Sequence, residues 1–403
     1  MTRNQKEKKS VNQVSRNRYH DTEVTLPMLG FGAMRLPEKE GKIDRVAAQK
    51  MVDDAMACGV NYFDTAYMYH DGESEAFLGE ALAKYPRESF YLTDKMPIIM
   101  LASEADNERI FNEQLERTRA GYFDFYLMHW LNDSHWEMAK RFRTWEFMKR
   151  MQAEGKIRRL GFSFHGDAAK LKEIAETHPW DLVQIQLNYL DWEDCHACEQ
   201  YEILTNLGIP VAVMEPLKGG TLTRLGDEIR GIFMKANPNA GLASWGLRYV
   251  ASLPNVLVTL SGMSSREQVE ENIRTFTPME PLTDAERETI SEALAVYRRS
   301  IPIPCTNCHY CVPCPAGVDI PRNLAIANQL KAITHPFDKL TVRNNYVTIP
   351  LAEQATSCVT CGICQTRCPQ QIDIPKHLKE LTEGLEGWEK ALPLPPTVET
   401  TNH

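Results

Sequence analysis

The feature that most constrains the fold is a regular alternation of apolar runs with amphipathic, helix-like stretches between residues 28 and 276. Eight of the runs are typical of β-strands: residues 29–34, 61–66, 90–95, 124–129, 157–163, 182–187, 210–215 and 256–262. Eight strands that alternate with helices over roughly 250 residues predict a closed parallel (β/α)8 barrel. A doubly wound open sheet is the alternative, but it needs a G-x-G-x-x-G turn after its first strand, and the chain has GFGAMR there.

Short sequence motifs predict where several helices, a loop and a linker begin. Ser265-x-x-Gln268 and Thr283-x-x-Glu286 are capping boxes, and each predicts the start of a helix. Residues 217–238, rich in Gly and charge, predict a long loop after the seventh strand. The proline-interrupted RRSIPIPC at 298–305 predicts a linker to a separate C-terminal part.

Composition narrows the function classes. The 403-residue chain has a net charge of −9, so a nucleic-acid partner has no electrostatic support beyond six Lys and Arg in the first twenty residues. It has no long apolar run, which predicts no membrane span, and no apolar leader, which predicts no secretory signal. We therefore expect a cytoplasmic protein whose eleven cysteines are thiols or metal ligands and do not form disulfides.

Eight of the cysteines form two similar runs near the C-terminal end. The first contains Cys305, Cys308, Cys311 and Cys314, and the second contains Cys358, Cys361, Cys364 and Cys368. The second run is a C-x2-C-x2-C-x3-C-P motif, in which three thiolates bind one [4Fe–4S] cluster and the fourth binds the other cluster of a pair. This rule predicts two clusters, with Cys368 completing the first set and Cys314 the second. Zinc is the alternative, but it leaves the extra cysteines and both Cys-Pro steps unexplained.

These signals predict four parts of the chain. Residues 1–22 are expected to be a disordered basic terminus, and residues 23–298 the barrel. Residues 299–380 are expected to form a ferredoxin-like dicluster domain, which is mostly helical because PRNLAIANQLKAI (321–333) separates the cysteine runs. Residues 381–403 are expected to be a disordered tail.

Titratable residues of complementary type follow successive strands of the predicted barrel. Asp64 ends the second strand, Tyr69 lies in the next loop, Lys95 ends the third strand and His129 ends the fourth. Active sites of such barrels lie at the carboxyl ends of the strands. A lysine cation lowers the pKa of a neighbouring tyrosine, a carboxylate keeps that lysine charged, and a histidine can orient a substrate oxygen. The four residues therefore predict a proton-donor site.

The segments FDTAYMY, YLTDKM and FYLMHW, which contain these four residues, resemble the aldo-keto reductases over roughly residues 24–295. The resemblance implies a carbonyl–alcohol oxidoreductase that binds a nicotinamide cofactor without a Rossmann fold. It also implies that Tyr69 is the general acid, Lys95 tunes it, Asp64 pairs with Lys95, and His129 orients the carbonyl. With the cysteine runs, the chain is similar to a subgroup of the family that has a C-terminal ferredoxin-type extension.

The resemblance further implies nucleotide contacts at Gly32, Ala33, Met34, Ser163, Gln184, Met214, Leu217, Gly219, Ser261, Gly262, Gln268 and Asn272. Met214 stands where the family usually has a stacking aromatic residue. Gly262 and Gln268 stand where NADPH-preferring members have a Lys and an Arg, and Arg266 or Lys218 are the nearby cations that could replace them. NADH and NADPH thus both remain open, and no motif indicates a flavin.

Three functional hypotheses follow. The first is an iron–sulfur oxidoreductase that acts on a small carbonyl or alcohol, exchanging electrons through its clusters, through NAD(P)H, or through both, with an electron-transfer protein as a further partner. The second is an NAD(P)H-dependent reductase with purely structural clusters. The third is a redox-sensing binding protein with little turnover. A hydride carries two electrons and a cluster passes one, so the first hypothesis requires a coupling step.

Overall fold

The structure is a computed structural model of the whole chain. It describes residues 13–20, 22–166, 168–194, 197–300, 302–331, 342, 346 and 349–385. The expected disordered tail lies outside these residues from 386 onward, as do the first twelve residues of the expected basic terminus. Contacts within the chain divide it into two units, Met1–Glu292 and Ala293–His403, and each is described by itself.

The first unit is a closed barrel of eight parallel strands, in the order β10-β11-β12-β3-β6-β7-β8-β9. All eight predicted strands are confirmed: β3 (Leu29–Gly32), β6 (Tyr62–Asp64), β7 (Tyr91–Pro97), β8 (Phe123–Leu131), β9 (Ile157–Phe164), β10 (Leu182–Gln186), β11 (Val211–Met214) and β12 (Val256–Gly262). Most of their residues are buried, since a parallel strand of a barrel faces side chains inside and helices outside. The predicted fold class is therefore correct.

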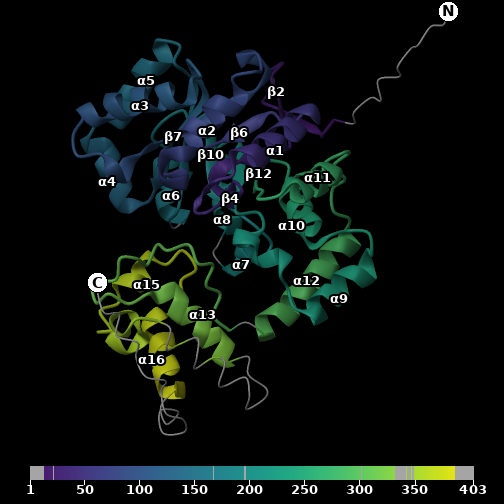
Figure 1. Cartoon of the computed structure of the whole chain (residues 1–403), viewed down its shortest axis with the longest axis vertical. Helices are drawn as coiled ribbons and strands as arrows, with labels where there is room; N and C mark the ends of the chain where they lie inside the picture. The colour runs from purple at the N-terminus through teal and green to yellow at the C-terminus, as the bar shows by residue number, and fades with distance from the viewer. Residues whose placement is uncertain are drawn as a thin grey trace, which may run out of the picture. The chain divides into compact units, whose positions relative to one another are not determined.

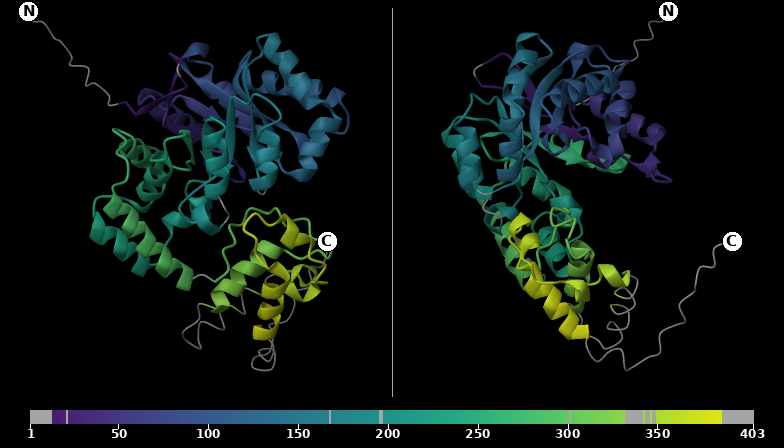
Figure 2. Two further views of the ribbon diagram at one scale, coloured as in Figure 1. Left: turned by 180° about the vertical axis from the view of Figure 1, so that it is seen from behind. Right: turned by 90° about the vertical axis from the view of Figure 1, so that its left-hand side faces the viewer.

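Helices follow the strands along the chain (Figures 1 and 2). They are α1 (Arg45–Ala57), α2 (Glu73–Leu82), α3 (Ala105–Thr118), α4 (Asp133–Arg141), α5 (Thr144–Ala153), α6 (Ala168–Ala175), α7 (Asp191–Asp194), α8 (Ala197–Asn206), α9 (Asp227–Ala236), α10 (Leu242–Ala251), α11 (Arg266–Thr275) and α12 (Asp284–Ser300). Several of them, such as α3, α5 and α10, pack against the barrel. Both helices predicted from capping boxes begin as expected, with a complete capping box at Thr283, whereas the Gln268 side chain bonds to the residue before its N-cap Ser265. Gln268 accepts from the Ser264 amide at 2.8 Å, and Glu286 accepts from the Thr283 amide at 2.9 Å.

Two expectations about irregular segments in this unit were wrong. Residues 217–238 are not a continuous loop, because they contain the 3-10 turn η5 (Lys218–Thr223) and the helix α9, whose apolar Ile229 and Phe233 are buried. The expected disordered terminus contains the strand β1 (Arg16–Arg18), which pairs with β2 (Thr25–Pro27). The hairpin packs its Tyr19 and Leu26 into a cluster with Tyr62, Leu182 and Leu257, at the amino ends of the barrel strands.

The second unit is mostly helical in the residues that the structure describes, as expected. It contains α13 (Ile320–Lys331), η6 (Leu351–Glu353), η7 (Ala355–Ser357), α15 (Ile363–Arg367) and α16 (Ile374–Leu385). Helices α13 and α16 lie side by side (Figure 2) and share an apolar core that includes Leu324, Ile326, Leu378 and Leu381. The division between the units falls inside α12, not after residue 298 as expected. No helix among the described residues is long and apolar enough to cross a membrane.

Candidate active site

The four predicted site residues lie at the carboxyl ends of neighbouring strands. Asp64 is the last residue of β6, and Tyr69 begins the 3-10 turn η2 (Tyr69–Gly72) in the following loop. Lys95 and His129 lie in β7 and β8, each two residues before its strand ends. Because β6, β7 and β8 are adjacent in the barrel, the three strands bring these side chains to one end of it.

Lys95 is the centre of this group. Its ammonium nitrogen Nζ is 2.6 Å from Asp64 Oδ1, donates to the Thr65 carbonyl at 2.7 Å, and is 3.4 Å from the Tyr69 hydroxyl. The ring centroids of Tyr69 and His129 are 6.0 Å apart with an interplanar angle of 82°. All three donors of a buried ammonium group thus have a partner, and one partner is the phenol that would move a proton.

Burial controls the protonation of the site. It opposes the charge on Lys95, but Asp64 and Tyr69 together outweigh it and raise the pKa of that lysine. Burial also raises the pKa of Tyr69, and it outweighs the lowering effect of Lys95, which was expected, so the net shift is upward. Burial and then the Lys95 charge hold the pKa of His129 well below 6.5. At neutral pH the site therefore combines a protonated phenol, a charged lysine and a neutral imidazole.

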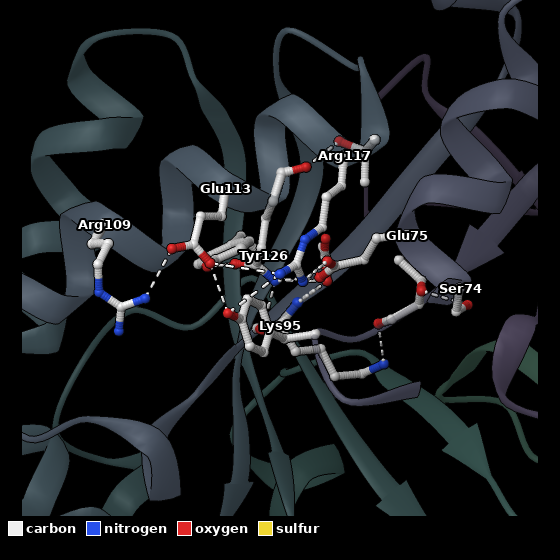
Figure 3. A network of polar contacts seen from close by, with 12 residues as sticks. Ser74, Glu75, Lys95, Arg109, Glu113, Arg117 and Tyr126 are labelled. Atoms are coloured by element: carbon white, nitrogen blue, oxygen red, sulfur yellow. Dashed lines mark hydrogen bonds and ion pairs between the residues drawn. The ribbon is translucent and has the colours of Figure 1, made fainter. Parts of the chain in front are cut away.

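A buried polar network lies behind Lys95 (Figure 3). The Gln114 amide, on α3, donates to Asp94 Oδ1 at 2.9 Å, to the Lys95 carbonyl at 3.0 Å and to Glu75 Oε1 at 3.0 Å. Asp94 Oδ1 also accepts from the Lys95 amide at 2.8 Å, and Arg117 donates to Glu75 at 3.0 Å. Burial and then the neighbouring Glu75 raise the pKa of Asp94 well above its usual range. The network fixes the Lys95 backbone through both its amide and its carbonyl.

A cavity of about 840 Å³ opens between the ends of β11 and β12, a volume in the range of cofactor sites. Six of the predicted nucleotide contacts line it: Leu217, Gly219, Ser261, Gly262, Gln268 and Asn272. Gly32 is paired in register with Gly262 on one side and with Asp64 on the other. The ends of β12 and β3 therefore lie at the same height along the barrel as the end of β6, which carries Asp64.

The other six predicted contacts lie outside this cavity. Ser163 and Gln184 are buried and paired in register on β9 and β10, and the Ser163 hydroxyl accepts from the Trp130 amide at 2.8 Å. Gln184 Oε1 is buried with no hydrogen-bond partner among the described residues, and so is His129 Nδ1. Met34 is 53% exposed, and Gly32, Ala33 and Met214 lie on the same rim. Asp64 Oδ2 is a third such atom, so this end of the barrel has three buried polar atoms that a polar ligand could satisfy.

In the structure, both cations that the sequence suggested as contacts of a nucleotide phosphate are paired with carboxylates of the chain. Lys218 is buried and forms an ion pair with Asp191, and Arg266 forms an ion pair with Asp54 at 2.6 Å. Neither residue lines the cavity. The choice of these two residues as substitutes was therefore wrong, because sequence spacing does not show which lysine or arginine already has a partner.

Three arginines that the sequence reasoning missed line the cavity instead: Arg35, Arg224 and Arg230. The stem of Arg35 lies against Gly262, where an added Cβ would be 3.2 Å from its Cγ and Cδ. Its guanidinium is 3.6 Å from Glu215 Oε1. Arg35 directly follows Met34, a predicted nucleotide contact, so its position in the sequence could have indicated it. Arg224 and Arg230 lie in the segment that was expected to be a loop, and nothing in the sequence indicated them.

The eight cysteines of the second unit surround two small cavities. Cys305, Cys308, Cys311 and Cys368 line one, and Cys314, Cys358, Cys361 and Cys364 line the other. This grouping follows the exchange of the fourth cysteine between the two motifs, including Cys314 after the shortened gap. Burial and then the neighbouring cysteines raise the pKa of Cys311 to about 12. Iron binding at this set would therefore have to displace thiol protons.

Among the described residues, no three His, Cys, Asp or Glu side chains are arranged to hold a single metal ion. Each cysteine set nevertheless supplies the four thiolates that one [4Fe–4S] cluster needs.

The structure is thus of the class of closed parallel barrels with a Tyr, Lys, Asp and His group at the carboxyl ends of the strands, and it has a cysteine-rich second unit. The sequence pattern of the aldo/keto reductase family matches residues 28–295, and the pattern of a 4Fe-4S dicluster domain matches residues 304–373. The chain therefore belongs to the aldo/keto reductase family of NAD(P)H-dependent oxidoreductases and carries a C-terminal 4Fe-4S dicluster domain.

Relatives of known name match the barrel. The chain is 29% identical over 222 residues to the NADH-specific methylglyoxal reductase of Escherichia coli, covering 50% of this chain and 67% of that protein. It is 26% identical to the L-galactose dehydrogenase of Arabidopsis thaliana, over 68% of this chain and 92% of that protein. The solved holo form of the aldo-keto reductase AKR11C1 from Bacillus halodurans has a TM-score of 0.58 at 24% identity, covering 70% of this chain and 96% of the other. That structural likeness supports the fold.

Proposed function

We propose that the chain interconverts a small carbonyl compound and its alcohol at Tyr69, Lys95, Asp64 and His129, with a nicotinamide nucleotide in the cavity between β11 and β12. The observation that carries the proposal is the contact of one buried lysine with both Asp64, at 2.6 Å, and the Tyr69 hydroxyl, at 3.4 Å. Two features support nucleotide binding: the cavity volume of about 840 Å³ and the unpaired Gln184 Oε1.

In the reducing direction, Tyr69 is the proton donor to the carbonyl oxygen. The reduced nicotinamide, when bound, supplies the hydride that adds to the carbonyl carbon. Lys95 stabilises the phenolate that remains, and Asp64 keeps Lys95 charged in its buried position. The neutral His129 can donate a hydrogen bond to the carbonyl oxygen and orient it, which a preformed, water-excluding site makes effective. A solvent proton then restores the phenol, so each turnover consumes one carbonyl, one hydride and one proton.

We further propose that the second unit binds two [4Fe–4S] clusters, one in each cysteine set. The first set would be Cys305, Cys308, Cys311 and Cys368, and the remaining four cysteines would form the second. The clusters would supply or accept single electrons. The grouping of the eight cysteines around two cavities supports this proposal. Anaerobic purification with iron and sulfide analysis tests it: eight of each per chain are expected from two four-iron clusters, and zinc in their place would overturn it.

Deuterium transfer tests which reductant serves the carbonyl. The purified protein is supplied with NADH or NADPH deuterated at the transferable position of the nicotinamide and with a panel of carbonyls. The panel begins with methylglyoxal, the compound in the name of the Escherichia coli relative. We expect deuterium on the new carbinol carbon. Alcohol without deuterium, formed at the same rate, would contradict direct hydride transfer and would favour delivery of electrons through the clusters.

A further inference from the structure

The turn that carries Tyr69 has an unusual backbone. His70 and Asp71 have φ angles of 51° and 55°, and Gly72 follows with a φ of 90°. Three successive residues are thus in the left-handed region, where a residue with a Cβ is strained relative to glycine. Strain of this kind at an active site persists only where surrounding contacts hold the backbone in place. The side chain of His70, the first of these residues, makes contacts of this kind.

The His70 ring joins the Tyr69 turn to a segment beside the nucleotide cavity. The ring is 8% exposed, and its Nε2 accepts from the Leu36 amide at 3.1 Å. Because Nε2 is the acceptor, the ring proton is on Nδ1, which is 3.0 Å from Glu38 Oε1. Leu36 directly follows the 3-10 turn η1 (Ala33–Arg35), whose Arg35 lines the cavity. One imidazole thus makes two directed contacts across this junction.

A second contact ties the same two segments together. The Ser74 hydroxyl, in the first turn of α2, donates to the Ala33 carbonyl at 3.0 Å and is 2.9 Å from the Thr65 hydroxyl. The Thr65 carbonyl in turn accepts from Lys95. His70, the first of the strained residues, and Ser74, which follows them, therefore both join η1 to the Tyr69 turn.

The opposite flank of the turn is anchored to α3. The Tyr67 hydroxyl donates to Glu113 Oε2 at 2.7 Å, and the Arg117 guanidinium lies 4.4 Å from the Tyr67 ring centroid. Tyr69 thus lies between two anchored residues, His70 on the η1 side and Tyr67 on the α3 side. Of the two, only His70 has the strained backbone, so its ring contacts are the ones that must offset a conformational cost.

We propose that His70 is a positioning residue. Its ring holds the strained turn against η1, and this contact places the Tyr69 hydroxyl beside Lys95 and couples that placement to the segment that borders the nucleotide. The inference rests on the proposed role of Tyr69 as the proton donor. It predicts that loss of the ring lowers the rate of the chemical step while substrate binding and folding stay intact.

The substitution His70→Gly separates the two effects, because glycine accepts the left-handed backbone without strain but lacks the ring. We expect kcat for carbonyl reduction to fall about tenfold, with KM within about twofold and the melting temperature unchanged or higher. His70→Asn keeps a residue that tolerates this backbone and a side-chain acceptor for the Leu36 amide, so it should recover part of kcat. The nucleotide dissociation constant, from quenching of protein fluorescence, is measured for each variant.

His20 provides a matched control. It also has a left-handed backbone, with a φ of 49°, but it is exposed in the turn between β1 and β2. His20→Gly makes the same chemical change and should leave kcat at the wild-type value. A wild-type kcat in His70→Gly would overturn the assignment. So would a loss of kcat that His70→Asn does not recover and that follows the fraction of unfolded protein.

The companion variant Tyr69→Phe separates this inference from the proposed function. An inactive Tyr69→Phe beside a fully active His70→Gly overturns the role of His70 and leaves that of Tyr69 standing. A fully active Tyr69→Phe overturns both. An inactive Tyr69→Phe with a tenfold loss in His70→Gly at unchanged KM supports both.

Discussion

The barrel site and the cysteine module differ in whether the chain itself supplies partners for their functional side chains. In the barrel, Lys95 already has Asp64, Thr65 and Tyr69 as partners, and the Gln114 network holds its backbone. In the module, the eight thiols surround two cavities, and burial raises the pKa values of Cys311, Cys364 and Cys368. Residues of the chain itself pair the Lys95 ammonium in the first site, whereas the proposed clusters would satisfy the sulfur atoms of the second. Stability and activity should therefore respond separately to the two units.

Removal of iron should produce the largest difference between the units. Treatment with an oxidant and a chelator, or the substitution Cys358→Ser, should abolish the cooperative unfolding transition of the module, because metal binding and folding are coupled in such sites. The barrel transition should remain, since its core cluster contains no cysteine ligand. Differential scanning calorimetry checks this, with Cys58→Ser in the barrel as the matched control. Loss of both transitions would contradict the separation of the units.

A change in the network behind Lys95 should destabilise the barrel alone. Gln114→Leu leaves Asp94 and Glu75 buried without their amide donor, and we expect a loss of about 3 kcal/mol in the free energy of unfolding. Urea unfolding followed by tryptophan fluorescence measures it. Gln152→Leu, at a half-exposed position on α5, is the control and should cost about 0.5 kcal/mol or less. Equal losses in the two variants would show that the network does not support the site.

The cavity arginines offer a smaller test on the ligand side of the barrel. Arg224→Gln removes a cation that lines the proposed nucleotide cavity, and we expect NADH and NADPH to bind about tenfold more weakly, a loss of about 1.4 kcal/mol in binding free energy. Arg266→Gln is the control, because Arg266 is paired with Asp54 outside the cavity. Fluorescence titration gives both dissociation constants. A selective loss of NADPH binding would instead place Arg224 at the 2′-phosphate.

The pH dependence should show the smallest effect. Reduction needs Tyr69 protonated, and its pKa lies above the ordinary value of 10.0. It also needs His129 neutral, and its pKa lies well below 6.5. Neither group changes protonation between those limits, so kcat for reduction should be flat from about pH 7 to pH 9. A change in kcat with a midpoint near pH 7.5 would show that another group controls proton transfer or that a bound ligand lowers the pKa of Tyr69.

The strands could be predicted because each is an apolar run with its own boundaries, and the cysteine-rich domain because its motif spacing is specific. The hairpin at β1 was missed because Arg16 and Arg18 read as a polar terminus, although Asn17 Nδ2 donates to the Val256 and Leu257 carbonyls. The fold itself, including the mostly helical module, followed from local patterns of this kind.

The cations of the proposed nucleotide cavity could not be predicted, for a different physical reason. Lys218 and Arg266 had suitable positions in the sequence, but Asp191 and Asp54 are their partners in the folded chain. Arg35 reaches the cavity because Gly262 leaves room for its stem, which is a long-range packing relation. The same holds for Gln114, whose three acceptors come from α2 and β7. Pairing between distant residues, unlike periodicity, has no local signature.

The most direct test of the account compares wild type and Tyr69→Phe for carbonyl-dependent oxidation of NAD(P)H, under anaerobic conditions and at equal iron content. The substitution removes one hydroxyl next to Lys95 and leaves all eight cysteines in place. We predict a loss of about a thousandfold in kcat, the scale of general acid catalysis, with an unchanged visible cluster spectrum. Turnover at the wild-type rate would contradict the assignment of the reaction to the barrel site.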